Sequence, residues 1–407
     1  MNIFHASDLH YCTKHLKIVD RAFSAAVDHA IETEAECAVI SGDSFDSAIN
    51  VHEPAVTALI RQIQRLADKM PVLILQGTFS HDRPGSLNVL GAMFTLFPIH
   101  IADQAEQIKL VINDMNPLEC EWLPISEERF GFSDAAIFNC LPSLNKAEPE
   151  IVKIGAAKYV QALMNKWAFE NATANVPTIL VSHGTVNGCV TESKHAMISP
   201  DHEFSSDVLF SSECNAIMLG HIHKHQSWKN GVQTIAYPGS ITRLVFGHND
   251  PVGFLIWKVS TEATFVEFVP TPAPRLIDIT FDGAPDVDEL LAHAENVDEG
   301  DHVRIRYSID QDFAHTVDKE QIRNIFHHVD VLKIEGTINA VQSVRAKGIG
   351  TAMTIDEKLG YWAVTTGDED RLDDLSERLE QLRTMDPDQI VAGLLKSNEV
   401  IDEQEAA

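Results

Sequence analysis

The chain begins with short apolar runs that alternate with longer amphipathic stretches. Runs of four to six residues bounded by turn residues are typical of buried strands, and they lie at Ile3–Ala6, Ala38–Ser41, Val72–Leu75, Ala136–Leu141, Thr178–Ser182 and Ala216–Leu219. Between the first of them, apolar residues recur at helical spacing over Leu16–Glu32 and Glu53–Ala67. Because strand and helix alternate, we expect an α/β domain with largely parallel central strands.

The pattern changes after residue 226. The segment Gln226–Tyr237 contains Asn230-Gly231, which is a strong hairpin signal. The segments Gly253–Val259 and Thr264–Val269 form a second pair of strands. The proline-rich run PTPAP over 270–274 then predicts a stiff, extended connector. We therefore place a first domain at residues 1–270, closed by antiparallel strands.

Residues 275–366 are expected to form a small α+β domain, because five segments there follow the pattern strand–helix–strand–helix–strand. The tail, residues 367–407, carries leucines at helical spacing, at Leu372, Leu375, Leu379 and Leu382. After a break at Asp386-Pro387, a second apolar set follows at Ile390, Val391, Leu394 and Leu395. Two short amphipathic helices cannot bury their own apolar faces. They are expected either to bind a partner or to pack against the 275–366 domain.

Composition excludes some classes of protein. A chain of 407 residues without an apolar run of about 18 residues is not expected to span a membrane. Scattered cysteines and the lack of a signal-peptide pattern predict a cytoplasmic protein. The net charge of −29 argues against a protein that coats nucleic acid through its overall field, although it leaves room for a local basic channel. The tail alone holds 13 acidic and 4 basic residues.

Residues that bind metals follow five of the predicted strands. In order, these segments are Asp8-Leu9-His10, Gly42-Asp43-Ser44-Phe45-Asp46, Gly77-Thr78-Phe79-Ser80-His81-Asp82, Ser182-His183-Gly184 and Gly220-His221-Ile222-His223. The carboxyl ends of parallel strands converge at one edge of a sheet, so these segments are expected to meet. A mixed set of carboxylates and imidazoles suits two divalent cations about 3.5–4 Å apart, with Mn²⁺ favoured and Mg²⁺ also compatible.

In that order, the motifs DxH, GDxxD, the HD loop, the strand-end His and GHxH resemble the calcineurin-like metallophosphoesterase superfamily. The hairpin that ends in Tyr237-Pro238-Gly239-Ser240, the proline-rich link and the leucine-bearing tail resemble the SbcD-type DNA repair nucleases of bacteria and phages. The motifs cover residues 1–270, whereas the later parts match only in size and order.

The resemblance implies a sandwich of parallel and mixed sheets flanked by helices, with an α+β capping domain and a helical tail. It also implies a two-metal DNA nuclease with 3′→5′ exonuclease and endonuclease activities. Its partners would be DNA, an SbcC-like ATPase whose coiled coil binds the tail, and a second copy of the chain in a homodimer.

Roles for single residues also come from the resemblance. It assigns Asp8, His10 and His223 to one metal, His183 and His221 to the second, and Asp43 to both. His81 would protonate the leaving oxygen, Asp82 would orient its imidazole, and Asp46 would be an outer-shell or capping residue. Contacts to the substrate are expected from Tyr237 and Ser240 and from Arg243, which lies just beyond a site motif.

One loop departs from the family pattern. The usual Gly-Asn-His-Asp is longer here by two residues, and Ser80 precedes His81. A hydroxyl is a weaker oxygen donor than an amide carbonyl, so Ser80, Thr78 or a water molecule is expected in that ligand position. We therefore expect weakened binding of the second metal and a need for high manganese.

Two other functions are compatible with the same residues. A phosphatase or cyclic-nucleotide phosphodiesterase would apply the cluster to a small substrate. A non-catalytic scaffold would bind DNA ends without cutting them, although a cluster of carboxylates without cations would repel itself. Histidines outside the motifs, among them His5, are expected to pack or to lie at the surface.

Overall fold

The computed structural model describes residues 1–48, 50, 52–145, 147–191, 203–340, 350 and 353–391. The chain forms two compact units, the first made of residues 1–308 and 317–337, the second of residues 309–316 and those from 338 onward. The domain limits at 270, 275 and 366 stay predictions.

The first unit contains a six-stranded sheet that carries the amino-terminal half of the site. Its order is β15-β14-β1-β2-β3-β4, in which the four strands from β1 to β4 are parallel and β14 runs antiparallel to both of its neighbours, β1 and β15. The strands are β1 (Asn2–Ala6), β2 (Cys37–Ile40), β3 (Val72–Leu75), β4 (Ile99–Ala102), β14 (Gly253–Val259) and β15 (Thr264–Pro270). Parallel strands here bring three metal-ligand segments to the same edge.

A seven-stranded sheet carries the rest of the site, in the order β12-β13-β11-β8-β7-β5-β6. Its four central strands are parallel, and β12, β5 and β6 are antiparallel to their neighbours. The strands are β5 (Glu106–Asn113), β6 (Cys120–Pro124), β7 (Phe132–Leu141), β8 (Thr178–His183), β11 (Ala216–Gly220), β12 (Gln226–Asn230) and β13 (Gln233–Tyr237).

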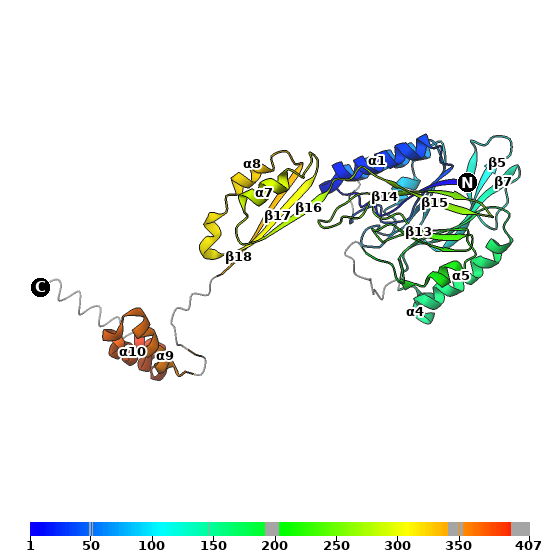
Figure 1. The fold of residues 1–407 in the computed structure, drawn as a ribbon. Coiled ribbons are helices and arrows are strands. Elements are labelled where there is room, and N and C mark those ends of the chain that lie inside the picture. The colour runs from blue at the N-terminus through cyan, green and yellow to red at the C-terminus, as the bar shows by residue number, and fades with distance from the viewer. Residues whose placement is uncertain are drawn as a thin grey trace. The chain divides into compact units, whose positions relative to one another are not determined.

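The two sheets pack face to face, with helices on both outer faces (Figure 1). One apolar cluster lies between the sheets and joins residues such as Leu73 and Trp257 to Phe138 and Val181. A second cluster packs α1 (Leu16–Glu32) and α2 (Pro54–Ala67) on the first sheet. A third packs α5 (Ala156–Thr173) and α6 (Ser206–Phe210) on the second. The predicted α/β sandwich of mixed sheets flanked by helices is therefore confirmed.

Short elements connect these layers. They are η1 (Thr13–His15), α3 (Asn88–Gly91), α4 (Pro149–Ile154), β9 (Thr185–Val186) and β10 (Glu203–Phe204).

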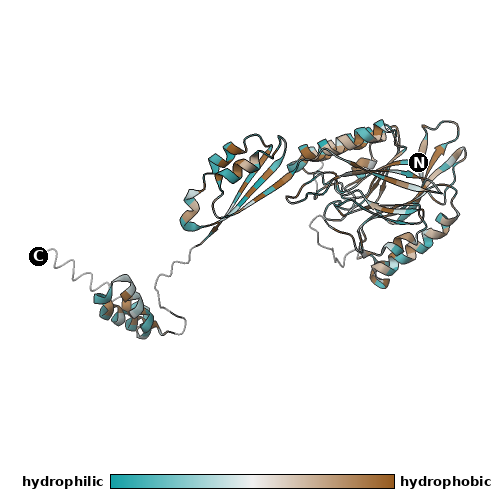
Figure 2. Cartoon of the chain, in the orientation of Figure 1, coloured by the Kyte–Doolittle hydropathy of each residue, from teal (hydrophilic) through white to brown (hydrophobic). Residues whose placement is uncertain are grey.

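A three-stranded sheet follows the proline-rich link, in the order β16-β17-β18. Its elements are β16 (Leu276–Asp282), α7 (Val287–Ala294), β17 (His302–Asp310), α8 (Lys319–Ile325) and β18 (Val331–Asn339). Burial alternates along β17, where Val303, Ile305 and Tyr307 are buried. Figure 2 shows the same alternation of apolar and polar residues on these strands. The strand–helix–strand–helix–strand prediction is confirmed for this sheet.

The second unit contains η2 (Gln311–Thr316), α9 (Ile355–Thr366), η3 (Glu369–Arg371) and α10 (Leu372–Thr384). A capping box at Thr354 and Glu357 begins α9, and Gly367 in a left-handed conformation ends it. Arg383 of α10 donates two hydrogen bonds to Asp356 of α9, at 3.0 and 2.8 Å. The expected amphipathic helix at 372–382 is present, and the prediction at Leu394 and Leu395 lies outside the described residues.

Sequence patterns missed several outer elements, namely β4, β5, β6, α4 and α5. The edge strands β4 and β6 are only partly buried, so their apolar pattern is weak. None of the helices in the described residues combines the length and the apolar character that crossing a bilayer requires.

Candidate metal centre

The loops after β1 and β2 run side by side at the edge where the two sheets meet. The amides of Asp8 and His10 donate to the carbonyls of Gly42 and Asp43, both at 3.1 Å. Asp8, His10 and Asp43 have positive φ angles of 52°, 50° and 51°. Residues other than glycine rarely adopt this conformation, which costs about 1–3 kcal/mol each and is concentrated at functional sites. The strained backbone at these three residues therefore sets the directions of their side chains.

Glycines let the strand ends approach one another. A Cβ atom on Gly220 would lie 2.1 Å from the carbonyl oxygen of Ser41 and 2.8 Å from Nδ1 of His183. A Cβ atom on Gly77 would lie 2.2 Å from Oδ1 of Asp43. No real Cβ atom fits at such distances. The glycines of the GHxH and GxxxHD segments are therefore required by packing at this centre.

The first group of donors comprises Asp8, His10 and His223, with one donor atom from each lying within 4.8 Å of the others. Nε2 of His10 lies 3.0 Å from Nε2 of His223, and the latter lies 3.8 Å from Oδ1 of Asp8. The carboxylate of Asp8 also accepts hydrogen bonds from the amide of His221 at 3.1 Å. The structure thus brings together the three residues assigned from the sequence to one metal.

The second group comprises Asp43, His183 and His221, again with donor atoms within 4.8 Å of one another. Oδ2 of Asp43 lies 3.3 Å from Nε2 of His183 and 3.9 Å from Nε2 of His81. The rings of His183 and His221 meet edge to face, with centroids 5.3 Å apart. This is the set predicted for the second metal.

The donor set fits divalent cations. Nδ1 of His10 is buried and has no hydrogen-bond partner among the described residues, and the buried Nε2 of His183 lies 3.3 Å from Oδ2 of Asp43. Buried polar atoms are normally hydrogen-bonded, so buried nitrogens that face one centre without a full set of hydrogen bonds indicate that the centre binds a ligand. Two buried carboxylates and four imidazoles match the mixed preference of Mn²⁺, Fe²⁺ or Zn²⁺ better than that of Mg²⁺ alone.

Electrostatics point the same way. Burial raises the pKa of Asp8, and the neighbouring carboxylate of Asp43 adds to the rise. Burial also opposes ionisation of Asp43, yet the imidazole of His183 holds the pKa of Asp43 below its usual range. Against burial, Asp43 in turn raises the pKa of His183 to about 9. Without a cation, bound protons thus offset the negative charge of the two carboxylates. A bound cation would offset that charge in their place.

His5 supports His183 from behind, a connection that the sequence analysis missed. Nδ1 of His183 donates to the carbonyl oxygen of Ser41 at 2.7 Å, which directs Nε2 toward the centre. Nε1 of Trp257 donates to Nδ1 of His5, so the proton on Nε2 of His5 reaches Oγ of Ser41 at 2.7 Å. His5 is fully buried in β1, and nothing in the sequence around it distinguishes this role from ordinary packing.

The expectation that Asp82 orients His81 is wrong. The fully buried carboxylate of Asp82 accepts hydrogen bonds from the amides of Ser44, Phe45 and Gly77, at 3.2, 3.2 and 3.0 Å. It therefore joins the loop after β2 to the loop after β3. The imidazole of His81 is oriented by the Asp46 carbonyl, which accepts from Nδ1 at 2.5 Å. That bond leaves Nε2 of His81 on the side of Asp43.

Of the candidate hydroxyls, Thr78 contacts the centre. Its amide and its hydroxyl both donate to Oδ1 of Asp43, at 2.7 and 2.8 Å. Ser80 is an exposed residue on the same loop. The contacts thus favour Thr78 over Ser80 as the residue that serves Asp43, and a ligand role for Ser80 stays a prediction.

Two predicted substrate contacts are structural instead. The fully buried hydroxyl of Tyr237 donates to the Gly184 carbonyl at 2.6 Å and accepts from the Val186 amide at 2.9 Å. Ser240 is buried, and its amide donates to the His223 carbonyl at 3.0 Å. Both residues hold ligand segments in place and have no free surface for a substrate.

Arg243 is half-buried and donates to the backbone carbonyls of Asp250 and Pro274. Its guanidinium still lines a pocket with Lys14 and Lys333. Its role in substrate binding therefore stays a prediction.

No family model and no curated protein matches the chain. Among solved structures, it is similar to GAP50, the anchor in the inner membrane complex of Plasmodium, at 14% identity and a TM-score of 0.44, over 66% of this chain and 84% of that one. It is also similar to a putative 5'-nucleotidase from Staphylococcus aureus, at 13% identity and a TM-score of 0.40, over 66% of this chain and 54% of that one. A dimetal phosphatase from Danio rerio aligns at 10% identity and a TM-score of 0.37, over 65% of this chain and 98% of that one.

The buried position of His5 behind His183 can be tested through the pH dependence of stability. Burial lowers the pKa of His5 from 6.5 to about 3, so the folded protein keeps it neutral while the unfolded chain takes up a proton below pH 6.5. The free energy of unfolding therefore falls as the pH drops, by about 2–3 kcal/mol between pH 7 and 4.5 from this group. In His5→Gln, we expect this part of the decline to disappear in urea titrations with EDTA.

The matched control is His327→Gln, which changes an exposed histidine. Its pH dependence should equal that of the wild type. An unchanged acid decline in His5→Gln would show that His5 is not held neutral in the folded protein.

Proposed function

We propose that the chain is a metal-dependent phosphodiesterase that cuts DNA, with two divalent cations at the centre formed by Asp8, His10, Asp43, His183, His221 and His223. The observation that carries the proposal is the convergence of two ligand groups at one edge of the sandwich. Both groups lie beside His81, whose ring meets that of His10 edge to face with centroids 4.8 Å apart. A proton-transfer group thus lies next to the cation sites.

The chemistry divides between cations and side chains. Bound divalent cations would supply Lewis-acid stabilisation of charge on the phosphoryl oxygens. The buried carboxylates of Asp8 and Asp43 and the four imidazoles would hold these cations. His81 acts on the leaving oxygen: its Nδ1 proton is held by the Asp46 carbonyl, so the proton it transfers is the one on Nε2. Thr78 fixes the orientation of the Asp43 carboxylate.

DNA as the substrate is supported by charge placement. The chain carries a net charge of −29, yet Lys14, Lys17, Lys333 and Arg243 gather around one pocket. Lys14 lies four residues after the ligand His10 along the chain. A local cluster of cations in an acidic protein suits a polyanion that approaches a defined place rather than the whole surface.

A phosphatase or small phosphodiesterase is the second candidate. One observation favours it: all six ligands come from the sandwich, so the β16–β18 sheet is not needed to complete the centre. Comparing the turnover of linear duplex DNA with that of bis-p-nitrophenyl phosphate separates the two candidates. The DNA proposal fails if only the small ester is hydrolysed.

Asp43→Asn tests the metal centre. Because Asp43 is buried beside both His183 and His81, loss of its charge should remove divalent-cation binding and cleavage together. We expect at least about a hundredfold loss of each, since even outer-shell changes cost 10–100-fold. Calorimetry with Mn²⁺ and cleavage of linear duplex DNA in Mn²⁺ and in Mg²⁺ measure the two effects.

Asp282→Asn, at an exposed carboxylate that ends β16, is the control and should bind and cut like the wild type. Cleavage that persists in Asp43→Asn with either metal would refute the proposed centre. If neither the wild type nor Asp282→Asn cuts DNA although each binds both cations, the chain is a scaffold rather than a nuclease.

His81→Asn tests proton transfer. This variant should retain the cations, because the six ligands are unchanged, and should cut DNA about 10²–10⁴-fold more slowly. Its defect should shrink on p-nitrophenyl esters, whose leaving group needs no proton. Single-turnover rates on both substrates measure the difference. Normal DNA cleavage by His81→Asn would exclude the general-acid role.

We also propose that α9 and α10 bind the coiled coil of an SbcC-like ATPase. Apolar side chains of both helices line an open groove of about 480 Å³, at Ile355, Leu359, Trp362, Leu375, Leu379 and Leu382. Leu382 is 68% exposed, and together with the other residues of the groove it forms a contiguous apolar surface of the kind that binds partners. The acidic tail around the groove suits a partner helix that carries basic residues beside its apolar face.

Leu382→Glu should abolish co-purification with a co-expressed SbcC-type ATPase, because it places a charge in the groove. Val364→Glu is the matched control: Val364 is 60% exposed on α9 but does not line the groove. A chain that ends at residue 366 should keep its nuclease activity and lose the partner. Co-purification that survives both changes would refute this interface.

A further inference from the structure

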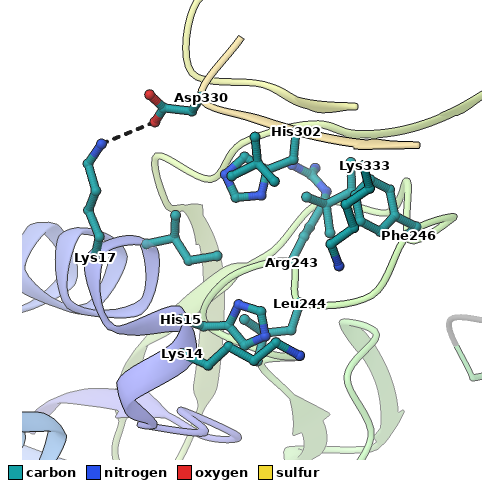
Figure 3. Close-up of a pocket in the computed structure, with 12 residues that line it drawn as sticks. Lys14, His15, Lys17, Arg243, Leu244, Phe246, His302, Asp330 and Lys333 are labelled. Atoms are coloured by element: carbon teal, nitrogen blue, oxygen red, sulfur yellow. Dashed lines mark hydrogen bonds and ion pairs between the residues drawn. The ribbon is translucent and has the colours of Figure 1, made fainter. Parts of the chain in front are cut away.

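A pocket of about 360 Å³ lies in the first unit, and none of the ligands of the proposed metal centre lines it. Its walls come from η1, α1, the segment after Thr242, and the β16–β18 sheet. Figure 3 shows Lys14, His15 and Leu244 on one side of the opening and His302 and Lys333 on the other. A volume of this size is typical of sites for small organic ligands.

Cationic groups dominate the rim of the pocket. Of its described lining residues, only Asp330 carries a negative charge, and Lys17 pairs with it at 3.2 Å. Lys14 and Lys333 are exposed and remain available for an anion. The Nζ atom of Lys333 lies 5.2 Å from the ring centroid of Phe246, which places it at the rim.

The interior of the pocket suits a flat, uncharged group. Aliphatic side chains form part of the wall, at Ile18, Leu244, Leu276 and Val331. Burial lowers the pKa values of His15 and His302 although Asp46 acts to raise the first and Asp330 and Asp301 the second, which favours neutral imidazoles at pH 7. Neutral imidazoles offer planar faces and one donor and one acceptor each. A plain phosphate site would need neither these rings nor the aliphatic wall.

The pocket is linked to the metal centre through Asp46. The carboxylate of Asp46 acts electrostatically on His15, and its carbonyl orients His81. η1, which contributes Lys14 and His15, follows the ligand His10 directly along the chain. Asp46 therefore acts both on a residue of the pocket and on His81 of the proposed centre.

We propose that this pocket binds one nucleotide, with its base against the aliphatic wall and the imidazoles and its phosphate beside Lys14 and Lys333. The inference deepens the proposed function and rests on it in one respect, namely that the nucleotide belongs to the strand being cut. A free mononucleotide has the same chemistry, and the experiment separates the two sources.

Binding is measured by calorimetry at low salt in EDTA, with full-length protein. The probes are deoxyadenosine monophosphate, inorganic phosphate and a short single-stranded oligodeoxyadenylate. We expect the mononucleotide to bind at least about tenfold more tightly than phosphate. Lys14→Gln and Lys333→Gln should each weaken nucleotide binding roughly tenfold, because each removes a charge-assisted hydrogen bond. Tighter binding of the oligonucleotide identifies a strand as the source, and equal or weaker binding identifies free nucleotide.

Lys166→Gln, an exposed lysine of α5 outside the pocket, is the matched control and should bind like the wild type. Lys14→Arg keeps the charge and should restore binding, which separates loss of charge from loss of fold. The proposal is overturned if phosphate binds as tightly as the nucleotide, or if the glutamine variants match Lys166→Gln. Because EDTA removes the cations, this outcome is independent of whether Asp43-dependent cleavage occurs.

Discussion

The whole centre depends on the close approach of strand ends from two sheets. Gly77 and Gly220 remove the side chains that would keep the strand ends apart, and Asp8, Asp43 and His221 adopt strained backbone angles there. Such geometry persists only where the surrounding packing determines it. The three apolar clusters provide that packing, and Asp82 ties two of the loops together through backbone amides. The rigidity of the centre is therefore a property of the sandwich rather than of the loops.

Sequence patterns predicted the parts of the fold that are buried most completely. β1, β2, β3, β8 and β11 were found because parallel strands covered on both faces are continuously apolar. The edge strands β4 and β6 were missed because their half-exposed faces dilute that signal. The meeting of the Asp and His side chains was likewise predictable, because the carboxyl ends of strands in α/β folds converge.

The connections around the ligands were less predictable. Tyr237 and Ser240 follow a strand end as substrate contacts would, yet both are buried and bonded to the backbone of ligand segments. The hydrogen-bond donors to Asp82 are the loop amides that lie near it in the folded chain, and residue spacing in the sequence does not predict which amides these are. His5 was indistinguishable from an ordinary core residue until its contacts with Trp257 and Ser41 were known.

The contact between His5 and Trp257 joins residues that are 252 positions apart in the chain. Trp257 belongs to β14, which pairs with β1 and is among the last strands of the sandwich to be synthesised. Contacts of such long range form late and slow folding. The support behind His183 is therefore absent until β14 has joined the sheet, so a growing or truncated chain that ends before residue 257 lacks a finished cation site. Maturation of the centre is coupled to completion of the domain.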